Sequence, residues 1–349
     1  MGYHVNAISE VERDESVVFF PSYGALARDG QTWRLRVRGC VFGPGREGLR
    51  RKFLMGLMRR ALRADDTELG SELFQRRAEP FLASMPKRRA IAIRVGGKTY
   101  ALKKRSRRHG HFGGVLRLSQ REIDKLRHNG HICDGRLRVE LVTRYHHSAP
   151  TFGHVELIKP RGVSIISDVD DTIKRTEVGC RRSMLTNTFL REFQEVDDMP
   201  TLYRDWADQG ASFHYVSSSP WQLCEALAEW FDEVGLPAGA FHLRRIRLRD
   251  PSVMRLFVAR GLGKFWAVRS ILRAFPRRRF VLIGDSGERD PEIYGAALRR
   301  YPNRVAKILI RNVSNRPAHT ARYLRAFRKL PQHKWQIFRD PTEIADAVF

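Results

Sequence analysis

The chain has 349 residues, of which 42% are hydrophobic and 29% are charged. This length allows two domains, each with its own hydrophobic core, and the composition excludes a mainly disordered or fibrous protein. The four cysteines are widely spaced and form no CxxC pair, which argues against a disulfide framework and a zinc site. No apolar run approaches the roughly 18 residues of a membrane span, and the acidic start lacks the order of a signal peptide, so we expect a cytoplasmic protein.

The net charge of +26 at pH 7 is the most unusual global property of the sequence. Residues 1–150 hold 31 Lys and Arg against 15 Asp and Glu, and residues 151–349 hold 33 against 23, so both halves are basic. A positive field favours phosphorylated substrates, nucleic acid or an anionic membrane as partners, and does not choose among them. The basic run from Lys103 to Gly114 is interpreted as a solvated loop, with contact to an anionic membrane or nucleic acid as the alternative.

The N-terminal half shows the alternation of apolar and polar residues that is typical of β-strands. The expected strands are Ser16–Pro21, Trp33–Phe42, Arg89–Leu102 and Gly135–Arg144. Between the second and the third, apolar residues at helical spacing predict helices over Gly48–Leu62 and Thr67–Ser84. We therefore predict a basic, strand-rich domain with a helical insertion over residues 1–158, and we find no catalytic constellation in it.

After Gly162 the pattern changes to apolar strands that alternate with amphipathic helices, which is typical of a parallel sheet covered on both faces. The expected strands are Val163–Ser167, Ala211–Ser217, Ala240–Leu243, Arg279–Asp285, Val305–Ile310 and Trp335–Phe338. The expected helices are Leu190–Ala207, Pro220–Val234, Lys264–Phe275, Pro291–Arg300 and Thr342–Val348. This pattern predicts a Rossmann-like α/β domain over residues 159–349.

Acidic side chains follow the first of these strands. In an open parallel sheet, ligands bind beyond the carboxyl ends of the strands. The segment SDVDDTIK places Asp168, Asp170 and Thr172 at alternate positions, so their side chains start from one face. Phosphate monoesters hydrolyse so slowly unaided that an enzyme needs a nucleophile, a proton donor and charge neutralisation. We predict that Asp168 is the nucleophile that takes up a phosphoryl group and that Asp170 is the general acid and base.

A second acidic pair follows the strand RRFVLIGD, where Asp285 is five residues before Asp290. Neighbouring carboxylates repel an anionic substrate unless a cation lies between them, and oxygen ligands suit Mg²⁺. The sequence therefore predicts a magnesium site formed by Asp168, Asp170, Asp285 and Asp290. For Asp290, a cap on the helix that follows is the alternative.

Polar and basic residues on other segments supply candidate phosphate contacts. Ser217, Ser218 and Ser219 end the strand SFHYVSSSP just before a helix N-terminus, where hydroxyls and amides can hold phosphate oxygens. We predict that Ser217, Ser218 and Thr172 contact the substrate, and that Lys264 neutralises charge on the phosphoryl group during transfer. The serines can instead cap the helix, and Lys264 can instead be a solvated helix residue.

Four aromatic residues lie on the predicted helices beside this site. They are Trp221, Trp230, Phe265 and Trp266. We expect them to pack into the core, with a lipid-binding lining as the alternative.

These motifs, in this order, resemble the haloacid-dehalogenase superfamily of aspartyl-phosphate phosphatases. More narrowly, the segments SDVDDTIKRTEVG, FHYVSSSPWQL, FHLR and FVLIGDSGERDPEIYG resemble the catalytic domain of the phosphatidate phosphatases typified by the fungal actin-patch-associated enzyme. The resemblance covers roughly residues 150–315 and implies a haloacid-dehalogenase-type fold. It also implies the same roles as above for the residues that match the motifs, namely Asp168, Asp170, Ser217, Lys264, Asp285 and Asp290.

We therefore expect a magnesium-dependent phosphatase that hydrolyses phosphatidate to diacylglycerol and phosphate through an aspartyl phosphate, in the cytoplasm and peripherally on membranes. Phosphatidate as the substrate is implied only by the closer family resemblance. Two alternatives remain open. One is a phosphatase for a soluble or nucleic-acid phosphomonoester, and the other is a non-catalytic protein that binds anionic lipid or nucleic acid.

Overall fold

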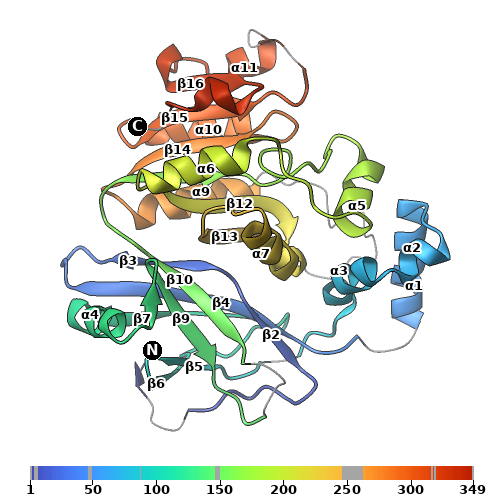
Figure 1. The fold of residues 1–349 in the computed structure, drawn as a ribbon, viewed down its shortest axis with the longest axis vertical. Coiled ribbons are helices and arrows are strands. Elements are labelled where there is room, and N and C mark those ends of the chain that lie inside the picture. Colours follow the sequence, from blue (N-terminus) through green and yellow to red (C-terminus); the bar gives the residue numbers. More distant parts are fainter. Residues whose placement is uncertain are drawn as a thin grey trace. The chain divides into compact units, whose positions relative to one another are not determined.

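The computed structural model describes residues 2–3, 7–45, 49–86, 88–145, 150–245, 262–315, 317 and 320–347. The chain divides into two compact units. The first consists of Met1–Arg51 and Glu79–Lys159, and the second of Lys52–Ala78 and Pro160–Phe349. The helical insertion, which the sequence pattern assigned to the N-terminal domain, is thus grouped by its contacts with the second unit. The colours of Figure 1 follow the chain through both units.

The first unit is built on a 10-stranded sheet that is mainly antiparallel. Its strands are β1 (Gly2–Tyr3), β2 (Ser16–Phe19), β3 (Ser22–Leu26), β4 (Thr32–Phe42), β5 (Ala92–Val95), β6 (Lys98–Ala101), β7 (His111–Ser119), β8 (Ile132–Cys133), β9 (Arg136–Leu141) and β10 (Phe152–Ile158). The strand order is β1-β6-β5-β9-β10-β3-β4-β2, with β7 paired to β4 and β8 to β9. On β4, the buried residues Trp33, Leu35 and Val37 alternate with arginines, so one face of the strand packs into the core.

The expectation of a strand-rich N-terminal region is confirmed, with differences in detail. The predicted strand Arg89–Leu102 is a hairpin of β5 and β6. The pattern missed β3, β7, β10 and helix α4 (Gln120–His128). The basic run was predicted to be a loop as far as Gly114, but its last residues lie in β7, where His111 is buried. Pairing with β4 along the whole of β7 outweighs the polar composition of the run.

The predicted insertion contains three helices, α1 (Leu49–Leu62), α2 (Asp66–Gly70) and α3 (Glu72–Leu82). Gly48, where the first was predicted to begin, lies outside the described residues. Asp65 and Glu68 form a capping box at the start of α2, and the extended backbone of Ser71 separates α2 from α3. The second predicted helix is therefore two helices.

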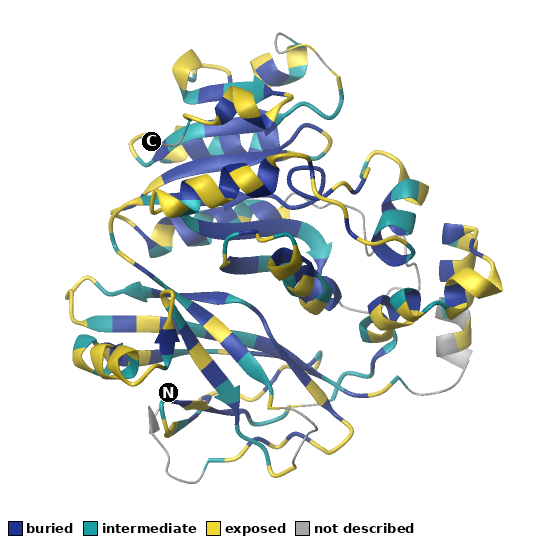
Figure 2. Ribbon diagram, in the orientation of Figure 1, coloured by how far each residue is buried: buried dark blue, intermediate teal, exposed yellow. Residues whose placement is uncertain are grey.

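The second unit contains a 6-stranded sheet in the order β13-β12-β11-β14-β15-β16. The strands are β11 (Val163–Ser167), β12 (Ser212–Pro220), β13 (Gly239–Arg244), β14 (Arg279–Asp285), β15 (Val305–Arg311) and β16 (Trp335–Phe338), and every neighbouring pair is parallel. All six predicted strands are confirmed. Helices flank this sheet (Figure 1), and its central strands are buried (Figure 2).

The helices of the second unit are α5 (Arg181–Phe189), α6 (Met199–Asp208), α7 (Cys224–Glu233), α9 (Leu262–Ala274), α10 (Asp290–Arg300) and α11 (Ala321–Ala326), with 3₁₀ turns η1 (Trp221–Leu223), η2 (Gln332–Lys334) and η3 (Pro341–Ile344). The predicted helix Leu190–Ala207 was wrong in its first half. Asp198 has a left-handed backbone, so α6 begins only at Met199.

The predicted helix Thr342–Val348 is in fact the short turn η3, and Val348 lies outside the described residues. Within the part of the chain that the structure describes, no helix is both long enough and apolar enough to cross a membrane.

The centre of the sheet determines where chemistry can occur. Strands β11 and β14 run side by side, and the amide of Asp168 donates to the carbonyl of Ile283 (2.9 Å). Ile165 and Ile166 on β11 are fully buried, as expected for a strand covered on both faces. The residues that follow β11 are therefore held on a rigid element beside the end of β14.

Candidate active site

Three neighbouring strands of the second unit carry reactive side chains to one edge of the sheet. Asp168 directly follows β11, Asp285 is the last residue of β14, and the serines lie at the end of β12. Strand β12 runs on to Pro220, with a register shift against β13 after Val216. Because the strands are parallel and adjacent, their carboxyl ends meet at this edge.

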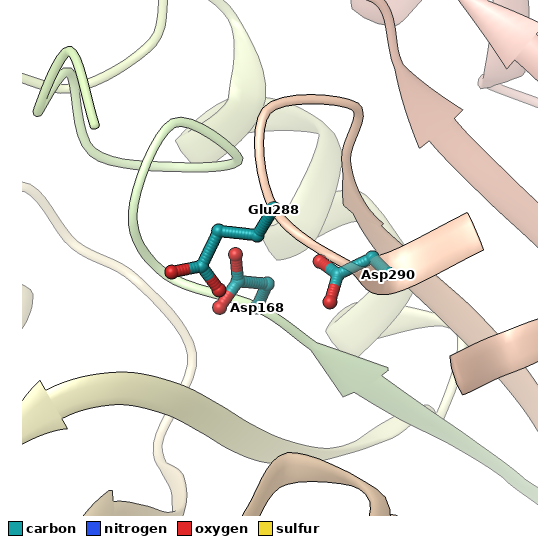
Figure 3. Close-up of side chains that lie close together, drawn as sticks. All are labelled: Asp168, Glu288 and Asp290. Carbon is teal, nitrogen blue, oxygen red and sulfur yellow. The ribbon is translucent and has the colours of Figure 1, made fainter. Parts of the chain in front are cut away.

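Lys264 is the centre of a buried cluster at this edge. Its Nζ lies 2.9 Å from Asp168 Oδ1, 3.1 Å from Glu288 Oε2 and 2.5 Å from Asp290 Oδ1. Figure 3 shows the three carboxylates pointing toward one another from the end of β11, the loop after β14 and the start of α10. Their ligand oxygens lie within 4.8 Å of one another. We call Asp168, Lys264, Glu288 and Asp290 the Lys264 cluster.

The Lys264 cluster holds three carboxylates against one ammonium group. Burial raises the pKa of Asp168 well above its ordinary value, and the neighbouring acids raise it further against the opposing effect of Lys264. Burial also raises the pKa of Asp290. Burial alone lowers the pKa of Lys264, but the surrounding carboxylates outweigh it and raise that pKa well above its usual range. The cluster thus lacks positive charge, and a divalent cation would supply it.

Asp285 stands beside the cluster and shapes the loop that carries Glu288. Its Oδ1 accepts hydrogen bonds from the amides of Gly287 and Glu288, the latter at 3.0 Å. Its Oδ2 is buried and accepts no hydrogen bond among the described residues. Burial, followed by the charge of Asp290, raises the pKa of Asp285 to about 7. A ligand position is therefore open on Asp285 in a place where extra positive charge is favourable.

Asp290 does not cap the helix that follows, because it is the first residue of α10 and the N-cap Arg289 makes no side-chain cap hydrogen bond within the described part of the chain. Its Oδ2 accepts a hydrogen bond from the amide of Asp285 (3.2 Å), and its Oδ1 faces Lys264. A Cβ on Gly284 would come within 2.1 Å of Asp290 Oδ2. Only glycine at this position lets the carboxylate approach the end of β14 so closely.

Asp170 lies in a second charged group rather than in the Lys264 cluster. Its carboxylate pairs with Lys174 Nζ (3.1 Å) and accepts hydrogen bonds from the hydroxyls of Ser217 (2.8 Å), Ser219 (2.7 Å) and Thr176 (2.8 Å). Burial raises the pKa of Asp170, but Lys174 and these hydroxyls outweigh it and lower the pKa to about 2. Asp170 is therefore ionised at neutral pH. We call Asp170 with Lys174 and the hydroxyls around it the Lys174 group.

The remaining predicted contacts are distributed between these two groups. Ser218 donates to Glu288 Oε2 (3.0 Å), whereas Ser217 contacts Asp170. Neither η1 nor α7, both in the described part of the chain, has a side-chain cap, so the serines do not serve as caps. Thr172 is fully buried, and its hydroxyl has no hydrogen-bond partner among the described residues.

The loop between these side chains is fixed by Asp171. This residue has a left-handed backbone with φ of 54°. Its carboxylate accepts hydrogen bonds from the amides of Thr176 (2.8 Å), Glu177 (2.7 Å) and Val178 (2.7 Å). The third Asp of the DVDDT motif thus holds the loop that carries Lys174.

Two charged residues of the site were not predicted from the sequence. Glu288 lies in the GDSGERD segment, three residues after Asp285, and Lys174 lies six residues after Asp168 in SDVDDTIK. Both were within quoted motifs, so a search for a charge partner to each predicted acid would have found them. Of the four predicted metal ligands, Asp168 and Asp290 come together with Glu288, Asp285 lies beside them, and Asp170 pairs with Lys174.

The aromatic residues beside the site are not all in the core. Trp221 and Trp230 are buried as expected. For Trp266 the expectation of core packing was wrong, because its side chain is 56% exposed. On α9, Lys264 and Val268 lie on the buried face, and Trp266 lies between them on the opposite one.

Comparison with known proteins finds sequences that are similar to the segment carrying this site. Residues 163–312 match the family model described as the catalytic domain of phosphatidate phosphatase APP1. The chain is 36% identical over 162 residues to phosphatidate phosphatase APP1 of Saccharomyces cerevisiae. The aligned segment covers 45% of this chain and 27% of that protein. It is also 34% identical over 164 residues to an uncharacterized protein of Schizosaccharomyces pombe. That alignment covers 46% of this chain and 26% of the other protein.

The chain therefore matches only about a quarter of the length of these curated relatives. The matched segment nevertheless contains every charged residue of the Lys264 cluster and of the Lys174 group. Residues 163–312 are thus similar to the catalytic domain of phosphatidate phosphatase APP1.

Proposed function

We propose that this protein is a magnesium-dependent phosphatidate phosphatase of the haloacid-dehalogenase type, with Asp168 as the nucleophile. The single observation that carries the proposal is the state of Asp168. It is fully buried at the end of a central strand, neither of its oxygens accepts a hydrogen bond among the described residues, and Lys264 lies 2.9 Å away. A carboxylate held in this way is free to attack phosphorus, and the family match supports phosphatidate as the substrate.

In the proposed reaction, a carboxylate oxygen of Asp168 forms a bond to phosphorus while the bond from phosphorus to the glycerol oxygen breaks. The leaving oxygen takes a proton from Asp170 and departs as diacylglycerol. Asp170 then removes a proton from water, and the water oxygen attacks the aspartyl phosphate and releases inorganic phosphate. Lys174 favours the ionised form of Asp170, which suits the second step. For the first step, the ion pair with Lys174 must loosen when substrate binds, so that Asp170 can take up from solvent the proton that it then donates to the leaving oxygen.

The Lys264 cluster supports the proposed need for Mg²⁺. Three carboxylates face one ammonium group, and the raised pKa values of Asp168 and Asp290 indicate that full ionisation of the site requires more positive charge than Lys264 supplies. Asp168, Glu288 and Asp290 would hold the ion, together with the open oxygen of Asp285. When bound, the ion supplies the charge neutralisation that lets a phosphate group approach these carboxylates.

Helix α9 supports a substrate at a membrane surface. It carries Lys264 on one face and exposes Leu262 (72%) and Trp266 (56%) elsewhere. The Arg269 guanidinium lies 5.0 Å from the centre of the Trp266 ring. Tryptophan and arginine together suit the interface between lipid headgroups and hydrocarbon. Peripheral association with anionic membranes is therefore part of the proposal.

The test is phosphate release from phosphatidate in mixed micelles, with and without Mg²⁺, alongside a soluble aryl phosphate. We expect magnesium-dependent release that Asp168→Asn abolishes and that Asp205→Asn, the same change on the exposed face of α6, leaves intact. Release from the aryl phosphate alone would keep the chemistry and reject the lipid substrate in favour of a soluble or nucleic-acid phosphomonoester. Release from neither would support the non-catalytic binding protein.

A further inference from the structure

A second place for an anion lies in the first unit, on the basic run that the catalytic proposal does not use. A hollow of about 450 Å³ is lined there by one serine and five cationic residues. These are Arg88, Lys104, Arg105, Ser106, Arg107 and Arg108. We call it the basic hollow. All five cationic side chains are exposed, whereas Ser106 is buried beneath them.

The backbone holds the basic hollow in shape. The amide of Ser106 donates to the carbonyl of Arg89 (2.8 Å), and the Ser106 hydroxyl accepts a hydrogen bond from the Arg89 amide (2.8 Å). This reciprocal pair brings Arg88 beside a segment 16 or more residues further along the chain. The hollow is therefore formed by two chain segments, one at Arg88 and one at residues 104–108, which these hydrogen bonds hold side by side.

The far end of the basic segment is also anchored. The amide of Arg107 donates to the carbonyl of His111 (2.8 Å), and that of Gly110 to the carbonyl of Arg107 (3.0 Å). A Cβ on Gly110 would lie 2.1 Å from the carbonyl oxygen of Val41, so the turn packs directly against β4. The cations are thus presented by an ordered turn, which lowers the entropy cost of binding an anion.

The charges of the basic hollow are mostly uncompensated. Arg105 pairs with Glu10 through two nitrogens (2.7 and 2.6 Å). Among the described residues, no carboxylate pairs with Arg88, Lys104, Arg107 or Arg108. Four positive charges therefore surround one small volume without partners inside the protein, and an external anion is their natural complement.

The lining favours one class of anion. Arginine binds the oxygens of phosphate in a bidentate manner, and a phosphomonoester carries close to two negative charges at neutral pH. The hollow has no aromatic side chain among its lining residues, and single-stranded nucleic acid is usually held by stacking on such residues. Its volume also suits a headgroup better than an extended strand. We propose that the basic hollow is a non-catalytic site for the phosphate headgroups of anionic lipids, which retains the protein on the bilayer.

The test is flotation of the full chain with phosphatidylcholine vesicles that contain a minor fraction of phosphatidate. Asp168→Asn is present throughout, so the lipid is not consumed and binding is separated from the proposed catalysis. The test variant is Lys104→Gln, Arg107→Gln and Arg108→Gln together. The matched control is Arg34→Gln, Arg117→Gln and Arg121→Gln, which removes three exposed cations from the same unit outside the hollow.

Each cation near an anionic bilayer strengthens binding roughly fivefold, so we expect the hollow variant to bind about 100-fold more weakly and the control to lose much less. In the otherwise wild-type chain, hydrolysis of a soluble aryl phosphate should be unaffected by the hollow variant. Equal losses in the two triple variants, or no loss in either, would overturn the proposal.

Two competitors test the source of the phosphate. Glycerol phosphate carries the same phosphate as the headgroup, so its affinity relative to vesicles decides: equal affinity for the hollow would show that the hollow takes a free phosphomonoester and would reject the lipid. Duplex DNA that binds through the hollow, while vesicle binding survives the triple substitution, would assign the site to nucleic acid instead. The lipid assignment requires that vesicles bind the hollow much more tightly than soluble glycerol phosphate does, and that DNA does not bind through it.

Discussion

Asp168 and Asp170 are two residues apart and both buried, yet their pKa values shift in opposite directions. Burial and three neighbouring acids raise the pKa of Asp168, and the single ammonium of Lys264 does not outweigh them. Burial also raises the pKa of Asp170, but Lys174 and three hydroxyls serve that carboxylate and lower its pKa to about 2. Because both acids are fully buried, the difference arises from their partners: Asp168 shares Lys264 with other carboxylates, whereas Asp170 has Lys174 and three hydroxyl donors.

The largest loss of activity is expected from a substitution in the Lys264 cluster, where three carboxylates share one lysine. Among the described residues, Lys264 is the one cation that pairs with Asp168, Glu288 and Asp290, so Lys264→Met should lower kcat by at least about 1000-fold. Phosphate release from phosphatidate measures this, with Lys329→Met, an exposed lysine, as the control. If Lys264→Met kept near-normal kcat, the role given to Lys264 would be wrong.

Lys174→Met tests the Lys174 group, in which a lysine and hydroxyls surround Asp170. Asp170 would lose its ion pair and keep only its hydroxyl contacts, so we expect kcat to fall roughly 100-fold with little change in KM. Because the pKa of Asp170 should then rise, the acidic limb of the rate profile should move to higher pH. A KM effect with unchanged kcat would show instead that Lys174 serves substrate binding.

Glu288→Gln makes the Lys264 cluster more like the Lys174 group by removing one of its three carboxylates. We expect Mg²⁺ to bind about tenfold more weakly. The increase in Tm on adding Mg²⁺ measures this without any substrate. Glu233→Gln, at an exposed position of α7, is the control and should leave the Mg²⁺ effect on Tm intact.

Glu156 on β10 is a third case, a partly buried carboxyl that is not in an ion pair with any described residue. Burial raises its pKa to about 7, against a smaller opposing effect of Arg136. The folded state therefore holds this proton more tightly than the unfolded chain, and its contribution to stability is lost as pH rises from about 4.5 to about 7. Glu156→Gln should weaken this loss and raise Tm at pH 8 by about 2–4 °C. An unchanged pH dependence of Tm would contradict the shift.

The sequence predicted the parallel sheet and its reactive edge because strong local signals coincide there. Each strand of the second unit is a short apolar run, and Asp168 and Asp285 follow two of them directly. Glu288 and Lys174 were missed because their roles depend on which carboxylate lies within reach, a property of the folded loops around Asp171 and Asp285.

The first unit was harder to predict because pairing outweighs local composition there. Strand β7 begins within a basic run that is typical of a loop, and nine consecutive residue pairs with β4 hold it in the sheet. For Trp266, residue type suggested burial, but the residue is exposed. Its aromatic side chain indicated a core position, but the helical period places it opposite the buried Lys264.

Rapid quenching of the reaction can show whether Asp168 carries the phosphoryl group during turnover. Protein mixed with phosphatidate labelled in its phosphate, in the presence of Mg²⁺, would be quenched in acid and digested. We expect transient, hydroxylamine-sensitive label on the peptide that contains Asp168, and none in Asp168→Asn. Label on another residue, or full-rate phosphate release with no labelled protein at any time, would contradict this role of Asp168.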